Sequence, residues 1–258
     1  MNISRRLILS LPAIACLPRP GAAEDAPIIA AASDLQFAMT EIAAAFTAAT
    51  GQEINISYGS TGNFARQIRE GAPYQMFLAA DEAFVLALAQ DGLTLDQGDR
   101  YAEGRVVIVA PKGSDLGKDG MLETLRQALH DGKISRFAIA NPDHAPYGQR
   151  AEEALRHAGL WDAINPFLIL GENVSQAAQF ALSGNAEGGI IAYSLALAPA
   201  LSDISDHALI PADWHAPLHQ RMVLLPNAGK TARALYNYLQ SPEARAVLAR
   251  YGFVLPGD

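Results

Sequence analysis

Short apolar runs alternate with stretches of helical periodicity along most of the chain, and this alternation restricts the fold more than any other feature of the sequence. The run at 28–32 predicts a buried strand. The apolar residues that follow it recur at intervals of four, three and four, which marks one face of a helix: Leu35, Met39, Ile42 and Phe46. Repeated strand-to-helix units are typical of a mostly parallel sheet covered by helices, so we predict an α/β fold.

The same pattern continues to the end of the chain. Further strands are predicted at 54–58, 76–80, 106–110, 137–140, 167–170, 189–193 and 222–225. Helices are predicted around 64–68, from about 82, and at 122–130, 149–158, 176–183, 231–239 and 242–251. A chain of 258 residues is longer than one compact core usually organises, which favours two lobes over one large α/β unit.

The composition excludes several classes of function. Half of the residues are hydrophobic and 18% are charged, which is typical of a compact fold and not of a disordered chain. The formal net charge is -8 and the 19 basic residues are scattered, so binding to nucleic acid is not expected. An acidic protein can still bind an anion if backbone dipoles, and not a field of basic side chains, supply the attraction.

The first residues have the pattern of an export signal. Arg5 and Arg6 precede an apolar run at 7–17 and a small-residue stretch at 21–23, so we predict a signal peptide at 1–23 and cleavage after Ala23. The apolar run is too short for a comfortable membrane span. The arginine pair leaves the twin-arginine export route open beside the ordinary one. The only cysteine, Cys16, leaves a lipoprotein tether open, although the usual leucine three residues before it is missing.

Four turns join predicted strands to predicted helices, and each could present helix N-terminal N–H groups to an anion. They are residues 33–34, 59–62, 141–148 and 171–175. Open α/β sheets bind ligands at the carboxyl ends of their strands, where such N–H groups lack partners. Ser33 and Asp34 are residue types that favour a helix N-cap. An ordinary capped helix that binds nothing is the alternative at each turn.

Five strings, in this order, resemble the periplasmic molybdate-binding proteins of bacterial ABC importers. They are AAASDLQFAM at 30–39, YGSTGNFARQI at 58–68, GAPYQMFLAAD at 71–81, NPDHAPYG at 141–148 and YNYLQSPEARAVLARYGF at 236–253. Tyr74 and Gln75 depart from the family pattern. The resemblance implies the type II periplasmic-binding fold, whose two α/β lobes are joined by two crossover strands. Lobe 1 would then hold residues 24–105 and 218–258, and lobe 2 residues 106–217.

The resemblance also implies a binding site. Ser33 matches a residue that offers the anion its hydroxyl and its backbone N–H, and Thr61 matches a second hydroxyl position, which a shift of one residue would give to Ser60. Tyr147 and Val174 match positions that donate backbone N–H groups. Tyr193 stands next to the position of a family tyrosine, so it is either moved into the site by a bulge or packed elsewhere.

The resemblance implies capture of molybdate, and of tungstate, by a periplasmic monomer that closes on the anion and passes it to a membrane permease with its ATPase. No cofactor and no bare metal ion are expected. A shell made only of donors would disfavour protonated phosphate. Two alternatives stay open: the same fold binding another oxyanion or a small carboxylate, and a serine hydrolase with Ser33 or Ser60 as nucleophile and His144 as base. No G-x-S-x-G motif supports the hydrolase.

Overall fold

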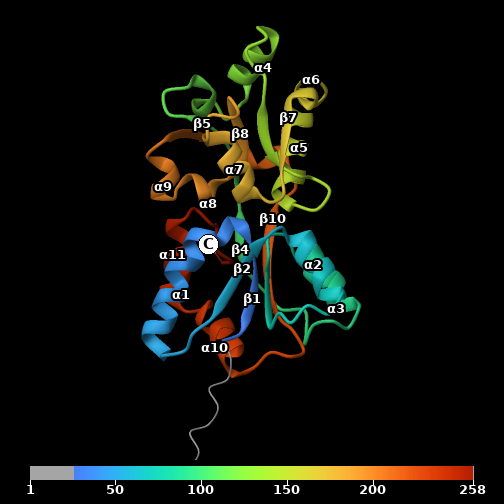
Figure 1. Cartoon of the computed structure of the whole chain (residues 1–258), viewed down its shortest axis with the longest axis vertical. Coiled ribbons are helices and arrows are strands. Elements are labelled where there is room, and N and C mark those ends of the chain that lie inside the picture. Colours follow the sequence, from blue (N-terminus) through green and yellow to red (C-terminus); the bar gives the residue numbers. More distant parts are fainter. Residues whose placement is uncertain (1–25, 258) are drawn as a thin grey trace, which may run out of the picture.

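The computed structural model describes residues 26–257 and shows two lobes, each built on a five-stranded sheet (Figure 1). The predicted signal peptide at 1–23 and Cys16 lie outside the described residues. In Figure 1 the lower lobe, lobe 1, contains both the blue and the red ends of the described chain, and the upper lobe, lobe 2, contains the green to orange middle. The predicted α/β class is therefore confirmed.

The sheet of lobe 1 has the strand order β2-β1-β3-β10-β4. Its first three strands are parallel, whereas the last strand of the chain pairs antiparallel to both of its neighbours. The strands are β1 (Ile28–Ala32), β2 (Asn55–Gly59), β3 (Met76–Ala79), β4 (Asp99–Gly104) and β10 (Leu218–Leu224). Helices α1, α10 and α11 pack on one face and α2 and α3 on the other. These helices are α1 (Gln36–Thr50), α2 (Thr61–Arg69), α3 (Glu82–Gln90), α10 (Lys230–Tyr238) and α11 (Pro242–Arg250).

The sheet of lobe 2 has the strand order β7-β6-β8-β5-β9. Its strands are β5 (Val106–Pro111), β6 (Phe137–Ala140), β7 (Leu168–Gly171), β8 (Gly188–Ala192) and β9 (Ser205–Leu209). The helices around it are α4 (Glu123–His130), α5 (Pro146–His157), α6 (Trp161–Ile164), α7 (Val174–Leu182), α8 (Tyr193–Ala196) and α9 (Pro199–Ser202). The chain passes from lobe 1 to lobe 2 at Arg105, the single residue between β4 and β5, and returns between β9 and β10.

The structure corrects several predicted boundaries. Ser33 and Asp34 do not cap a helix; they begin a short 3-10 turn (Ser33–Leu35), and α1 follows it without a side-chain cap. Helices α5 and α7 begin earlier than predicted, at Pro146 and Val174, because proline is well suited to a first helical position and Asn173 caps α7. The predicted strand at 189–193 ends at Ala192, and Tyr193 begins α8. Strands β4 and β9 were not predicted.

Candidate functional site

The four predicted turns meet at a small cavity between the two lobes. The cavity measures about 10 Å³, which is roughly the space that one water molecule requires. Among its lining residues are five of the six predicted site residues: Ser33, Ser60, Thr61, Tyr147 and Val174. The others are Ala32, Asp34, Gly59, Ala80, Ala145 and Pro146. A ligand larger than a water molecule therefore requires the lobes to move from the arrangement seen here.

Three helices begin at this cavity, and a backbone N–H group in the first turn of each has no hydrogen-bond partner in the described part of the chain. Thr61, Tyr147 and Val174 lie in the first turns of α2, α5 and α7, where an N–H has no partner inside its own helix. None of these three N–H groups donates to another atom within residues 26–257. Because helix N-termini also carry partial positive charge, the cavity attracts an anion without a cationic side chain.

Two hydroxyl groups add donors to the same cavity. The Ser33 Oγ accepts a hydrogen bond from the Ser175 N–H at 3.3 Å, and the Thr61 Oγ1 accepts one from the Ala80 N–H at 3.0 Å. Neither hydroxyl donates to a protein atom among the described residues, so each retains a proton for a ligand. Both residues are buried, so their hydroxyls are shielded from bulk solvent.

Ser60 has a different role from Thr61. Its Oγ caps α2 by accepting the Asn63 N–H at 3.3 Å, and it also lies 2.9 Å from His144 Nδ1. The neighbouring Gly62 N–H donates to the His144 carbonyl at 2.9 Å, and a Cβ on Gly62 would come within 2.5 Å of that oxygen. Ser60 and Gly62 therefore join lobe 1 to lobe 2, and Thr61 is the better hydroxyl donor for a ligand.

The lining also contains a carboxyl group that the sequence did not assign to the site. Asp34 is 1% exposed, and its Oδ2 accepts bonds from the Tyr147 hydroxyl at 3.0 Å and from Gln220 Nε2 at 2.6 Å. Gln220 Oε1 in turn accepts a bond from the Tyr101 hydroxyl at 2.7 Å. Burial raises the pKa of Asp34 to about 6, even though the bonds from Gln220 and Tyr147 lower it. Asp34 therefore places a carboxyl group in the lining beside the predicted donors.

Tyr193 does not join the other predicted residues. Its ring lies 5.7 Å from the His207 ring, centroid to centroid, and a Cβ on Gly252 would come within 2.5 Å of it. Its backbone N–H donates to the Arg105 carbonyl at 2.9 Å. The side chain thus packs beside the crossover and the C-terminal segment, not in the lining of the cavity.

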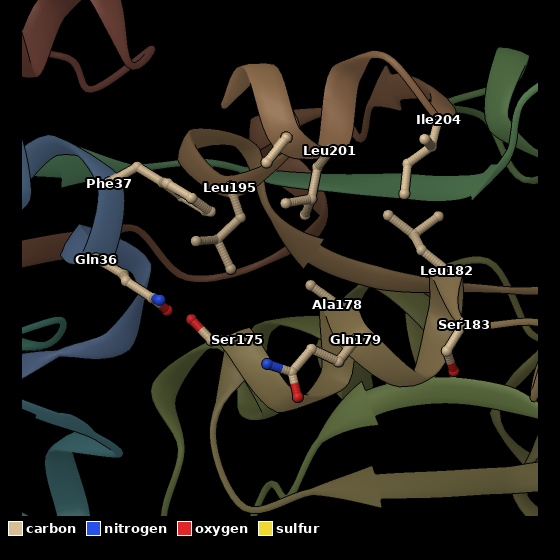
Figure 2. Close-up of a pocket in the computed structure, with 11 residues that line it drawn as sticks. Gln36, Phe37, Ser175, Ala178, Gln179, Leu182, Ser183, Leu195, Leu201 and Ile204 are labelled. Carbon is tan, nitrogen blue, oxygen red and sulfur yellow. The ribbon is translucent and has the colours of Figure 1, made fainter.

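A larger cavity of about 290 Å³ also lies between the two lobes, but its lining side chains do not suit an anion (Figure 2). Figure 2 shows Phe37 from α1 and Leu182, Leu195, Leu201 and Ile204 from lobe 2 around it, with Gln36, Ser175 and Gln179 at one side. Most of its lining side chains are apolar. The smaller cavity is therefore the better candidate for an anion site.

The chain is similar to bacterial solute-binding proteins over nearly its whole length. It matches the family described as bacterial extracellular solute-binding protein over residues 28–254. It is 32% identical over 241 residues to the molybdate-binding protein ModA of Rhodobacter capsulatus, an alignment that covers 92% of this chain and 91% of that protein. ModA of Azotobacter vinelandii is 34% identical over 257 residues, which is 97% of each chain.

A solved structure agrees with these sequence relatives. The periplasmic molybdate-binding protein of Azotobacter vinelandii matches with a TM-score of 0.79 and 29% sequence identity, over 89% of this chain and 99% of that one. The match includes both lobes and therefore the boundary between them, where the cavity lies. The chain belongs to the family of bacterial extracellular solute-binding proteins.

Proposed function

We propose that this protein captures molybdate, and also tungstate, between its lobes and delivers the anion to an ABC importer. The observation that carries the proposal is the convergence of three unpaired N–H groups and two free hydroxyl protons, from both lobes, on one compact cavity. A tetrahedral oxyanion offers acceptors in all directions and so suits donors that arrive from several sides. The ModA names of the relatives support molybdate among such anions.

The proposed mechanism is closure of the lobes around the anion. Ser33 and Thr61 of lobe 1 hold it, and the Tyr147 and Val174 N–H groups of lobe 2 complete its shell. Bonds between the lobes then hold the closed form, among them Ser175 Oγ to the Ser33 carbonyl at 2.8 Å and Arg150 to Asp81 at 2.6 Å. A permease with its ATPase would receive the anion from a periplasmic monomer.

Another oxyanion or a small carboxylate would use the same donors, so a ligand panel tests the proposal. Purified mature protein should be stabilised by molybdate and tungstate and not by sulfate, phosphate or acetate. At a molybdate concentration of 100 times Kd the gain is about 2.7 kcal/mol, which raises Tm by roughly 5 to 10 °C for a chain of this size. Stabilisation by phosphate or acetate alone would overturn the ligand assignment.

A serine hydrolase is the second candidate, because Ser60 Oγ and His144 Nδ1 are 2.9 Å apart. The carboxylate behind the histidine is poorly placed: Glu172 Oε1 is 3.7 Å from His144 Nε2 and its side chain is 64% exposed. The pair also spans the two lobes, so opening the cavity for a substrate would separate nucleophile from base. Hydrolysis of a p-nitrophenyl ester that is lost in Ser60→Ala would support this candidate; we expect none.

A further inference from the structure

The Asp34 carboxyl belongs to the cavity lining but has no part in the proposed function. Its Oδ2 has two hydrogen-bond donors, whereas its Oδ1 is buried and has no partner among the described residues. Buried polar atoms in native proteins are nearly always paired. Because the cavity is so small, any anion held by Ser33 and Thr61 also lies close to Asp34.

No positive charge offsets this carboxyl. The side chains that face it are the Tyr147 hydroxyl from α5 and the Gln220 amide from β10, with the Tyr101 hydroxyl of β4 behind them, and the backbone N–H groups of Asp34 and Leu35 also lie near it. Ser194 of α8 bonds its backbone carbonyl. Within residues 26–257, no Lys, Arg or His forms an ion pair with Asp34.

Arg150 and His144 lie near the boundary between the lobes, but neither neutralises Asp34. Arg150 of α5 is held by Asp81 at 2.6 Å and by Glu153 at 2.8 Å. His144 bonds Ser60 and not Asp34. An ionised Asp34 would therefore meet an incoming dianion in the same cavity with no cationic side chain among the described residues paired to it.

Two like charges in such a cavity do not both persist when one of them can take a proton. Burial already raises the pKa of Asp34 to about 6. In the ligand-free protein the Asp34 carboxyl is therefore mostly ionised near neutral pH, but a small further rise in its pKa would protonate it. A dianion beside the carboxyl would raise this pKa further. A protonated Asp34 would also gain an O–H donor, which its unpaired oxygen could direct at the ligand.

We propose that the site binds its oxyanion together with one proton, which Asp34 takes up from solvent and holds between its Oδ1 and a ligand oxygen. Protein with an ionised Asp34, the dianion and one proton from solvent combine, and the only covalent bond that forms is the O–H bond of the Asp34 carboxyl group. This inference rests on the proposed function, and it makes Asp34 a determinant of specificity. A ligand that carries its own acidic proton would need none from solvent.

Isothermal titration with molybdate tests the proposal, in two buffers of different ionisation enthalpy between pH 7 and 8.5. The wild-type protein should take up about one proton per molybdate, and its Kd should rise about tenfold per pH unit. In Asp34→Asn the amide oxygen can keep the bonds from Tyr147 and Gln220. Its Kd should be independent of pH, with no proton uptake, and tighter than that of the wild type at pH 8.5.

His144→Gln is the matched control, because it removes the histidine that contacts Ser60 of the cavity lining. This variant should keep the full dependence of the molybdate Kd on pH. Molybdate binding by wild-type protein with a flat Kd and no proton uptake would overturn the inference and leave the proposed function intact. A slope that persists in Asp34→Asn would also overturn it. If the wild-type protein bound no molybdate anywhere between pH 7 and 8.5, both the inference and the proposed function would be overturned. A wild-type proton count of zero overturns the inference even if Asp34→Asn does not fold.

Discussion

Thr61 and Ser60 are adjacent hydroxyl residues with different surroundings, and exchanging each for alanine should separate their roles. Thr61→Ala removes the hydroxyl whose proton is free to donate to the anion. A hydrogen bond to a charged group contributes about 1.5 to 3 kcal/mol, so molybdate Kd should rise about 10- to 150-fold. Ser60→Ala should change Kd much less, because the Ser60 oxygen is occupied by the Asn63 N–H and by His144.

Both variants should also lose stability, for separate reasons. Thr61→Ala leaves the buried Ala80 N–H without an acceptor, which costs about 1 to 3 kcal/mol. Ser60→Ala removes the N-cap of α2, which costs about 0.5 to 2 kcal/mol. Affinity must therefore be measured on folded protein, by isothermal titration at 25 °C, with thermal unfolding of the free protein recorded beside it. The two variants would show comparable losses of stability but very different losses of affinity.

Thr61→Ser is the control, since it keeps the hydroxyl and should bind molybdate nearly as well as the wild type. A larger loss of affinity in Ser60→Ala than in Thr61→Ala would refute the reasoning and give the donor role to Ser60. Unchanged affinity in Thr61→Ala would show that the hydroxyl does not reach the anion.

Three further outcomes are expected. In ligand-free protein, the raised pKa of Asp34 means that the folded form keeps its proton between pH 3.8 and about 6 while the unfolded form loses it. The contribution of Asp34 to stability is thus fully present below this window and falls by about 3 kcal/mol as the pH rises through it. The Tm difference between Asp34→Asn and the wild type should therefore move in favour of the variant from pH 4 to pH 7, and parallel Tm curves would contradict this. Ser33→Ala should raise the molybdate Kd about 10- to 150-fold, through loss of one hydroxyl donor and of the oxygen that accepts the Ser175 N–H; isothermal titration checks it, and an unchanged Kd would exclude Ser33 from the shell. Tyr193→Phe should leave the Kd unchanged, because the ring packs beside His207, and a clear loss by the same titration would place its hydroxyl in the site.

The interior strands could be predicted from the sequence, whereas two edge strands could not. β1 and β3 are continuous apolar runs because neighbours cover both of their faces. β4 reads DRYAEG and β9 reads SDHAL, and both lie at a sheet edge where polar side chains meet solvent. Their extended form depends on pairing with β10 and β5, which no local pattern reveals.

The binding donors could be predicted because they sit in strand-to-helix turns with recognisable residues, but the role of Asp34 could not. A serine and an aspartate before a helix predict a cap. The partners of this carboxyl are Tyr147, 113 positions away, and Gln220, 186 positions away. Only the packing of the two lobes shows that the aspartate is buried at the cavity.

The position of β10 also fixes when each lobe can be completed during synthesis. This strand lies between β3 and β4, inside the sheet of lobe 1, although it is the last strand that the ribosome makes. The N-terminal lobe therefore lacks a central strand until about 220 residues have been translated, whereas lobe 2 is one continuous segment and can form earlier. For most of its synthesis the chain therefore carries an unfinished lobe 1 together with a lobe 2 that can already fold.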